Sequence, residues 1–142
     1  ADLDEKTMEI MMRLKLEVVD LAGFEDLWPS ELSGGMTKRA ALARAIVLDP
    51  KVLFFDEPSA GLDPVVSAAI DELILRMRDR LGVTSLVITH DMESAYRIAD
   101  RIAMLHEGRV RTVGTPEEIR ASEDPLVRGF VEGRPELFEE AS

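Results

Sequence analysis

The sequence predicts an α/β fold in which helices flank a mostly parallel sheet. Two kinds of segment predict it: stretches with apolar residues at helical spacing among charges, and short, uninterrupted apolar runs. These segments alternate along the chain, which is typical of a parallel sheet. A chain of 142 residues, 46% of them hydrophobic, is long enough to form one globular domain with a sizeable core.

The first two elements are expected to be helices. Apolar residues recur at helical spacing over residues 4–21, and Gly23 follows where a helix would stop. A turn through the residues LWPSE then leads to a second helix, expected over residues 34–48, with Ser33 in position to cap its first turn.

Two strands and a long helix are expected next. The run KVLFF, residues 51–55, is typical of a strand that is buried on both faces. Asp63 and Pro64 indicate the N-cap and first residue of a helix that continues over residues 65–81. The run TSLVIT, residues 84–89, predicts a second buried strand.

The rest of the chain contains shorter elements. We expect a helix over residues 91–100 with Asp91 as its N-cap, then two strands, residues 102–106 and 109–113, joined by a two-residue turn. The residues TPEE, 115–118, form a capping box with proline at the first helical position and therefore predict a short helix.

Composition argues against several classes of protein. The net charge is −11, from 17 Lys and Arg against 28 Asp and Glu, so no nucleic-acid partner is expected. The absence of cysteine excludes disulfides and thiolate metal sites. The first residues lack the basic region and apolar run of a secretion signal, and no stretch is long enough to span a bilayer. We therefore expect a cytoplasmic chain.

The start of the second helix is a candidate anion site. Behind the Ser33 cap, the amides of Gly34, Gly35 and Met36 have no acceptor within the helix, and the helix dipole adds positive potential. Two glycines leave the backbone open to a phosphate. The alternative interpretation is an ordinary serine cap after a flexible turn.

Candidate catalytic residues follow both buried strands. Asp56 and Glu57 come directly after the first, at the carboxyl end, where ligands of open α/β sheets bind. Their side chains should diverge, so one carboxylate can hold Mg²⁺ through water while the other orients or deprotonates an attacking water. His90 follows the second strand, from which its imidazole can reach a phosphate or a water. The alternatives are a solvated turn and a structural histidine.

These motifs, taken in order, resemble the ATPase subunits of ABC transporters, and the resemblance runs through almost the whole chain. LSGGM resembles the signature motif, VLFFDE the Walker B strand with its catalytic glutamate, and SAGLD the D-loop. His90 is similar in position to the switch histidine. The resemblance implies a partial P-loop NTPase fold in which part of the helical lobe lies at the N-terminus.

The resemblance also implies the cofactors and the catalytic roles. ATP and Mg²⁺ are the expected cofactors, and Asp56 is expected to help hold the metal. Glu57 would polarise the attacking water, and His90 would contact the γ-phosphate.

A second ATPase subunit is the expected partner, in a homodimer that sandwiches the nucleotides. Ser33, Gly34, Gly35 and Met36 would bind the γ-phosphate of a nucleotide carried by the other subunit, and Asp63 would act across the interface. Membrane permease subunits are the other implied partners. They would hold the protein at the inner face of the cell membrane.

One departure concerns the signature itself. The commonest form has glutamine where this chain has Met36. The surrounding sequence, ELSGGMTKRAALARAIVLDP, is similar to ATPases of phospholipid-trafficking transporters that maintain outer-membrane lipid asymmetry. Transport of a lipid or another hydrophobic substrate is therefore expected.

A larger departure is the lack of a P-loop. The sequence contains no G-x-x-x-x-G-K-[ST], and it contains no glutamine for a Q-loop. We therefore expect the C-terminal part of a longer subunit, inactive by itself. Its single incomplete ATPase domain would comprise the helical lobe and signature helix (1–48), the Walker B, D-loop and histidine core (49–114), and the C-terminal helices and tail (115–142). In the family that the chain resembles, the Walker A strand lies beside the strand that ends at His90. Its absence here implies an open sheet edge, which predicts self-association.

Two other functions remain open from the sequence. One is a non-catalytic half-ATPase that completes or regulates the site of a partner. The other is the C-terminal lobe of a chromosome-maintenance or DNA-repair ATPase, which the net charge of −11 and the lack of sustained heptads disfavour.

Overall fold

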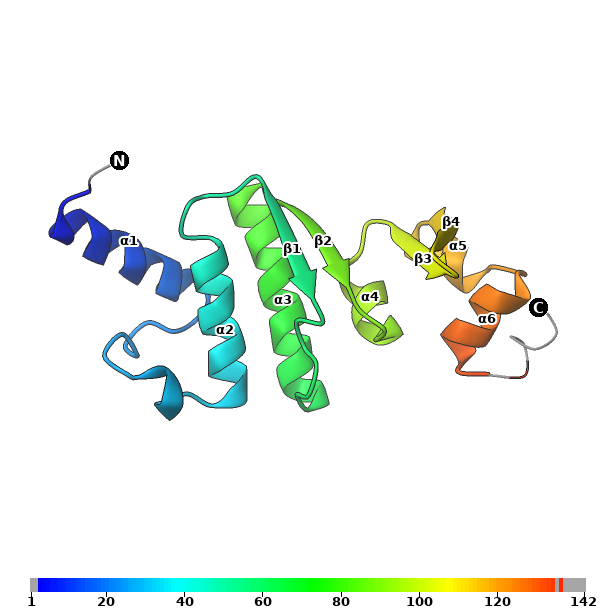
Figure 1. Ribbon diagram of the computed structural model, residues 1–142, viewed down its shortest axis with the longest axis horizontal. Coiled ribbons are helices and arrows are strands. Elements are labelled where there is room, and N and C mark those ends of the chain that lie inside the picture. Colours follow the sequence, from blue (N-terminus) through cyan, green and yellow to red (C-terminus); the bar gives the residue numbers. More distant parts are fainter. Residues whose placement is uncertain (1–2, 135, 137–142) are drawn as a thin grey trace. The chain divides into compact units, whose positions relative to one another are not determined.

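The computed structural model describes residues 3–134 and 136 of the 142. The chain forms two compact units, residues 1–89 and residues 90–142 (Figure 1). The expected C-terminal tail falls largely on residues 137–142, which lie outside the described residues.

Helix α1 (Glu5–Val18) opens the first unit. It begins where Asp4 accepts a hydrogen bond from the backbone amide of Thr7 at 3.0 Å, which is a standard N-cap. It ends three residues before the expected Leu21, because Asp20 takes a left-handed conformation with φ 57° and turns the chain.

Helix α2 (Gly34–Ala45) follows a 3₁₀ turn, η1 (Pro29–Glu31). The Ser33 Oγ accepts a hydrogen bond from the Met36 amide at 3.3 Å, so the predicted cap is confirmed. The helix begins where the sequence predicts and ends three residues earlier than expected.

Helix α3 (Pro64–Leu81) is the central helix of the first unit. The Asp63 carboxylate accepts hydrogen bonds from two amides of its first turn, at 3.0 and 3.1 Å. Gly82, in the left-handed conformation with φ 65°, ends the helix. Both predicted ends are confirmed.

The first unit contains a parallel two-stranded sheet. Strand β1 (Val52–Asp56) pairs with β2 (Thr84–Ile88), and Phe54 lies opposite Leu86. The two strands lie side by side next to α3, and α3 also contacts α2, which contacts α1 (Figure 1). The buried apolar residues of this unit are Val19, Leu21, Leu42, Ala43, Ile46, Leu53, Phe55, Ile70, Leu73, Ile74, Met77 and Val83.

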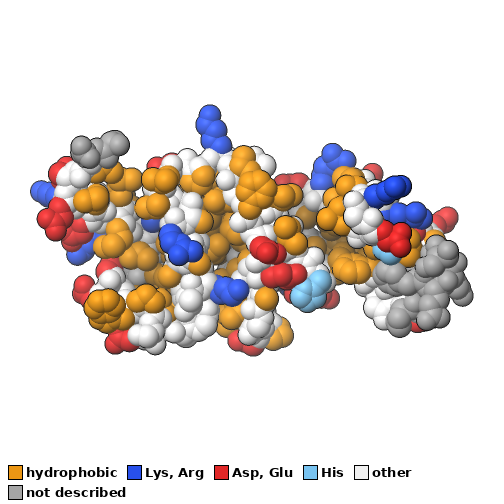
Figure 2. Space-filling view, in the orientation of Figure 1, with side chains coloured by type: hydrophobic (Ala, Val, Ile, Leu, Met, Phe, Trp, Pro, Cys, Tyr) orange, Lys and Arg blue, Asp and Glu red, His pale blue; other side chains and the backbone are white. Residues whose placement is uncertain are grey.

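The expectation that both strands are buried on both faces is wrong. The alternate residues Val52, Phe54, Leu86 and Ile88 share one face of the sheet and are 48%, 73%, 53% and 55% exposed. Figure 2 shows hydrophobic side chains over the strands in this view. The physical reason is that α3 packs against the other face, and no described element of the first unit packs against this one.

The second unit contains an antiparallel hairpin, β3 (Ile102–His106) and β4 (Arg109–Gly114). Glu107 and Gly108 both have positive φ, 48° and 73°, as a tight two-residue hairpin turn requires. The expected mostly parallel sheet is therefore only partly realised. The described strands form one parallel and one antiparallel pair in separate sheets.

Three helices accompany the hairpin: α4 (Met92–Ile98), α5 (Pro116–Arg120) and α6 (Pro125–Glu132). The capping box that the sequence predicts at the start of α5 is confirmed. The guanidinium of Arg120 lies 4.1 Å from the centre of the Tyr96 ring and joins α5 to α4. The buried apolar residues of this unit are Ile98, Ile119, Leu126 and Val127.

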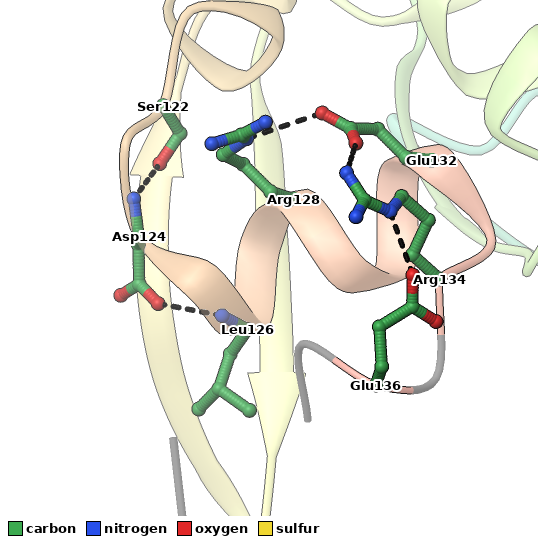
Figure 3. A network of polar contacts seen from close by, with 7 residues as sticks. All are labelled: Ser122, Asp124, Leu126, Arg128, Glu132, Arg134 and Glu136. Atoms are coloured by element: carbon green, nitrogen blue, oxygen red, sulfur yellow. Dashed lines mark hydrogen bonds and ion pairs between the residues drawn. The ribbon is translucent and has the colours of Figure 1, made fainter. Parts of the chain in front are cut away.

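Polar contacts fix both ends of α6 (Figure 3). At its start, Asp124 accepts a hydrogen bond from the Leu126 amide at 3.0 Å. At its end, the Glu132 carboxylate bridges the guanidinium groups of Arg128, at 3.1 Å, and Arg134, at 3.2 Å. These pairs are solvent-exposed, so each contributes little to stability.

Candidate functional site

The first unit has a surface hollow of about 470 Å³ between the starts of α2 and α3. We call it the helix-start hollow. It brings together five residues that the sequence singles out from two separate motifs. Its lining consists of Ser33, Gly34, Gly35, Met36, Arg39, Gly61, Leu62, Asp63, Val65, Val66 and Ala69.

The α2 side of the hollow has the character of an anion site. Thr37 donates the first hydrogen bond of the helix, to the Ser33 carbonyl at 2.8 Å, and the Met36 amide binds the Ser33 side chain. The amides of Gly34 and Gly35 come before the first hydrogen bond of the helix. They have no acceptor within the helix and can therefore bind an acceptor from a ligand. With the helix dipole, they favour a negative ligand such as phosphate.

The α3 side is formed by Gly61–Asp63 and the first turn of the helix. Gly61 has φ 77°, a backbone conformation that glycine adopts without strain, and it turns the chain toward Asp63. The Asp63 carboxylate caps α3 and remains exposed. The cap function predicted for Asp63 is therefore confirmed, and its carboxylate is accessible at the hollow.

Gly35 has a packing role that sequence reasoning missed. A Cβ placed on Gly35 would lie 2.9 Å from Cγ1 of Val66 on α3, which is closer than side chains tolerate. A Cβ on Gly34 would meet only Leu62 Cδ2, at an ordinary 3.7 Å. The second glycine is therefore needed for the close approach of α2 and α3, as well as for an open anion site.

Arg39 is a second residue of the hollow that sequence reasoning missed. It lies on α2, four positions after Gly35 and therefore on the same face of the helix. Its Nη1 donates to the Val19 carbonyl at 3.2 Å and to the Asp20 carboxylate at 2.8 Å. The spacing of Arg39 from the glycines was the signal that could have placed it here.

The acidic pair lies at the carboxyl end of β1. Asp56 is the last residue of the strand and is exposed, whereas Glu57 is half-buried. The Glu57 amide donates to the Ile88 carbonyl at 2.9 Å, and the Thr89 hydroxyl donates to the Glu57 carboxylate at 3.3 Å. The two chain segments that follow β1 and β2 are therefore joined through Glu57.

Glu57 adopts a strained backbone conformation, with φ 46°. A left-handed conformation is uncommon for a residue other than glycine, asparagine or aspartate, and it persists only where its surroundings fix it. Here the Glu57 amide is held by the Ile88 carbonyl, and the Glu57 carboxylate accepts a hydrogen bond from the Thr89 hydroxyl. The divergence of the Asp56 and Glu57 carboxylates stays a prediction.

His90 is the first residue of the second unit, and it is exposed. Asp91, next to it, caps α4 by accepting hydrogen bonds from the Glu93 and Ser94 amides at 3.0 and 3.2 Å. The cap predicted for Asp91 is confirmed. The structure thus gathers the other predicted site residues in the first unit and assigns His90 to the second.

Asp56 is the residue of the site that could bind the expected Mg²⁺ ion. Among residues 3–134 and 136, no group of three or more histidine, aspartate and glutamate residues could hold a metal ion. An exposed carboxylate at a strand end suits a cation whose other ligands are phosphate and water oxygens, as Mg²⁺ usually has in nucleotide sites.

None of the described helices is long and apolar enough to cross a membrane.

Comparison with known proteins agrees with the motifs. A family model described as ABC transporter matches residues 3–60. The intermembrane phospholipid transport system ATP-binding protein MlaF of Haemophilus influenzae is 44% identical over 131 residues, which are 92% of this chain and 50% of that protein. MlaF of Escherichia coli K12 is 44% identical over 84% of this chain and 45% of its own length.

Two further matches have lower sequence identity. The probable ribonucleotide transport ATP-binding protein mkl of Mycobacterium leprae is 40% identical over 92% of this chain and 38% of its own length. The structure of cbiO1 from Clostridium perfringens, part of the ABC transporter complex cbiONQ, superposes with a TM-score of 0.80 at 32% identity, over 98% of this chain and 56% of that chain. The chain spans about half the length of the curated MlaF proteins. It belongs to the ATP-binding proteins of ABC transporters.

Proposed function

We propose that this chain contributes the signature half-site, the acidic pair and the switch histidine of an ATP-hydrolysing subunit of an ABC transporter. The observation that carries the proposal is the helix-start hollow, where the first amides of α2 open beside the Asp63 cap of α3. Amides left over at a helix start are a ready receptor for phosphate, because the helix dipole and the donors act together.

In this proposal the hollow receives a nucleotide that the second ATPase subunit carries. The Ser33 hydroxyl and the amides of Gly34 and Gly35 bind the γ-phosphate of ATP, the Met36 amide holds Ser33 Oγ in place, and Asp63 contacts the other subunit. The exposure of Ser33 and Asp63 at the rim of the hollow supports these roles.

Asp56 and Glu57 act in the hydrolysis of ATP, together with His90. Asp56 helps to hold Mg²⁺, Glu57 orients the attacking water, and His90 contacts the γ-phosphate. Bound ATP with Mg²⁺ supplies the phosphoryl group and the cation that neutralises its charge. The two contacts that hold Glu57 support a preorganised carboxylate, since they fix its backbone and one of its oxygens.

The transported substrate is a phospholipid or another hydrophobic molecule. The names of the two MlaF relatives support this assignment, as does the methionine at position 36. In such a transporter the chain works with membrane permease subunits, as a peripheral protein at the cytoplasmic face of the membrane.

This chain by itself should not hydrolyse ATP, because its sequence contains no P-loop to hold the β- and γ-phosphates. A non-catalytic module that completes the site of a partner would use the same hollow. The relatives named above are transport proteins, which favours a transporter over a DNA-repair ATPase.

The test uses the full chain together with a separately expressed polypeptide of this family that carries a P-loop. We expect association that requires ATP and Mg²⁺, measured by analytical ultracentrifugation with a label on this chain. The substitution Ser33→Arg should abolish association, because it fills the hollow. The matched control is Ser30→Arg, since Ser30 is exposed on the preceding turn and does not line the hollow.

Two results would contradict the proposal. One is equal association of the Ser33→Arg and wild-type chains. The other is ATP hydrolysis by this chain alone that disappears in Glu57→Gln. Activity in the mixture that disappears in Glu57→Gln would favour an ATPase subunit over a non-catalytic module.

A further inference from the structure

Asp20 connects three helices of the first unit through one carboxylate. Its Oδ1 accepts from Arg76 Nη1 at 3.1 Å, and its Oδ2 accepts from Arg76 Nη2 at 2.5 Å. Its Oδ2 also accepts from Arg39 Nη1 at 2.8 Å. Asp20 follows α1, Arg39 belongs to α2 and Arg76 belongs to α3. The two-pronged pairing with Arg76 fixes direction as well as distance, because a guanidinium and a carboxylate are both planar.

The backbone around Asp20 is anchored on both sides. Val19 and Leu21 are buried, and the Leu21 amide donates to the Leu16 carbonyl at 2.8 Å. Arg39 also binds the Val19 carbonyl, so it contacts this turn at two points. The carboxylate of Asp20 is therefore presented from a rigid turn.

The two helices that Asp20 joins are the same two whose starts form the helix-start hollow. At the hollow, Gly35 and Val66 set how closely α2 and α3 approach. One steric contact leaves the angle between two helices free to vary about that point. The Asp20 bridge supplies a second restraint, since Arg76 lies twelve residues along α3, about 18 Å from its start at 1.5 Å per residue.

We propose that Asp20 is a positioning residue that fixes the orientation of α2 relative to α3 and thereby places the Gly34 and Gly35 amides opposite Asp63. The link to phosphate binding rests on the proposed function, whereas the effect on helix orientation does not. Arg39 contributes to this role, because it lines the hollow and Asp20 holds its guanidinium in place.

Charge is essential to the bridge. Hydrogen bonding from Arg76 lowers the pKa of Asp20 below its ordinary value, so the carboxylate is ionised at neutral pH. Asparagine at this position would keep the shape, and it tolerates a left-handed backbone well. Asp20→Asn therefore removes the charge and one acceptor oxygen without straining the turn.

The matched control is Asp49→Asn. Asp49 is also an aspartate with a left-handed backbone, φ 49°, and its carboxylate pairs with Lys15 of α1. It does not bridge α2 to α3. Asp49→Asn thus loses one ion pair, with Lys15, whereas Asp20→Asn loses the pairs with Arg39 and Arg76 and with them the connection between the two helices.

The first measurement is the orientation of α2 relative to α3 in the full chain, from residual dipolar couplings of backbone amides. We expect a changed angle in Asp20→Asn, with altered chemical shifts at Gly34, Gly35 and Gly61, and wild-type values in Asp49→Asn. Arg76→Gln should reproduce the change. Combining Arg76→Gln with Asp20→Asn should add little, because both substitutions break the same bridge.

The second measurement is the ATP-dependent association with the P-loop polypeptide. Asp20→Asn should weaken it about fivefold or more, at the lower end of typical coupling between sites, and Asp49→Asn should leave it unchanged. An unchanged helix angle in Asp20→Asn and Arg76→Gln would overturn the inference. A changed angle with unchanged association would overturn its link to the site. If the wild-type chain does not associate, the proposed function fails, and the helix angle alone decides whether Asp20 positions α2.

Discussion

Substituting alanine for Gly34 and for Gly35, one at a time, tests whether Gly35 is needed for the packing of α2 against α3 and Gly34 is not. The two residues are neighbours in the first turn of α2, yet only the Cβ built on Gly35 lies 2.9 Å from Val66 Cγ1. Val66 is β-branched and belongs to the first turn of α3, so it cannot rotate away freely. Relief therefore requires α2 and α3 to move apart at the hollow.

The expected magnitudes follow from two opposing effects. Alanine is favoured over glycine in a helix by roughly 0.5–1 kcal/mol, so Gly34→Ala should stabilise the chain by up to about that amount. Gly35→Ala gains the same benefit but adds one methyl group to a tight contact, which typically costs about 1–3 kcal/mol. We therefore expect Gly35→Ala to be less stable than Gly34→Ala by about 1–3 kcal/mol.

Urea unfolding followed by circular dichroism measures this difference directly. It should be done at several protein concentrations, so that self-association does not enter the comparison. A double variant, Gly35→Ala with Val66→Ala, should recover much of the loss, because the clashing methyl group is gone. Equal midpoints for Gly34→Ala and Gly35→Ala would refute the packing argument.

Three further predictions concern the sheet, the core and the hairpin. Phe54→Lys should reduce the expected self-association in sedimentation, because Phe54 is 73% exposed on the uncovered sheet face; Phe24→Lys, at an exposed phenylalanine outside the sheet, should not. Equal effects would contradict a role for this face. Leu73→Ala, at a fully buried position of α3, should lower the free energy of unfolding by about 2–5 kcal/mol in urea, and a loss well below this range would contradict the packing described for α3. Hydrogen bonding from Arg111 lowers the pKa of Asp124 below 3.8, so the stability it contributes is present above that value and is lost as the pH falls through the lower folded-state pKa. In Asp124→Asn, the thermal midpoint should fall less between about pH 5 and about pH 2 than in the wild-type chain.

The caps show what local sequence can predict. Ser33, Asp63 and Asp91 each accept hydrogen bonds from amides two or three residues ahead, and such contacts depend only on neighbouring residues. Helix starts were accordingly predicted to within one residue. The C-terminal ends of α1 and α2 were each predicted three residues too long, because the apolar pattern continues into the turns that follow.

The candidate site was also predictable in part. Its residue types and their order along the chain could be predicted, because Ser33 and Asp63 mark helix starts and Asp56 marks a strand end. That Ser33 and Asp63 line one hollow could not, since it depends on the packing of α2 against α3. The functional roles of Asp56, Glu57 and His90 remain predictions.

By itself, the sequence determined the order and type of the elements and the family, because caps, glycine turns and apolar periodicity are read over a few residues. Only the tertiary structure decided the contacts between residues far apart in the chain: Gly35 with Val66, and Asp20 with Arg39 and Arg76. It also decided that one face of β1 and β2 is exposed. The physical reason is that burial and ion pairing depend on which surfaces meet, and apolar side chains look alike in sequence whether or not another element covers them.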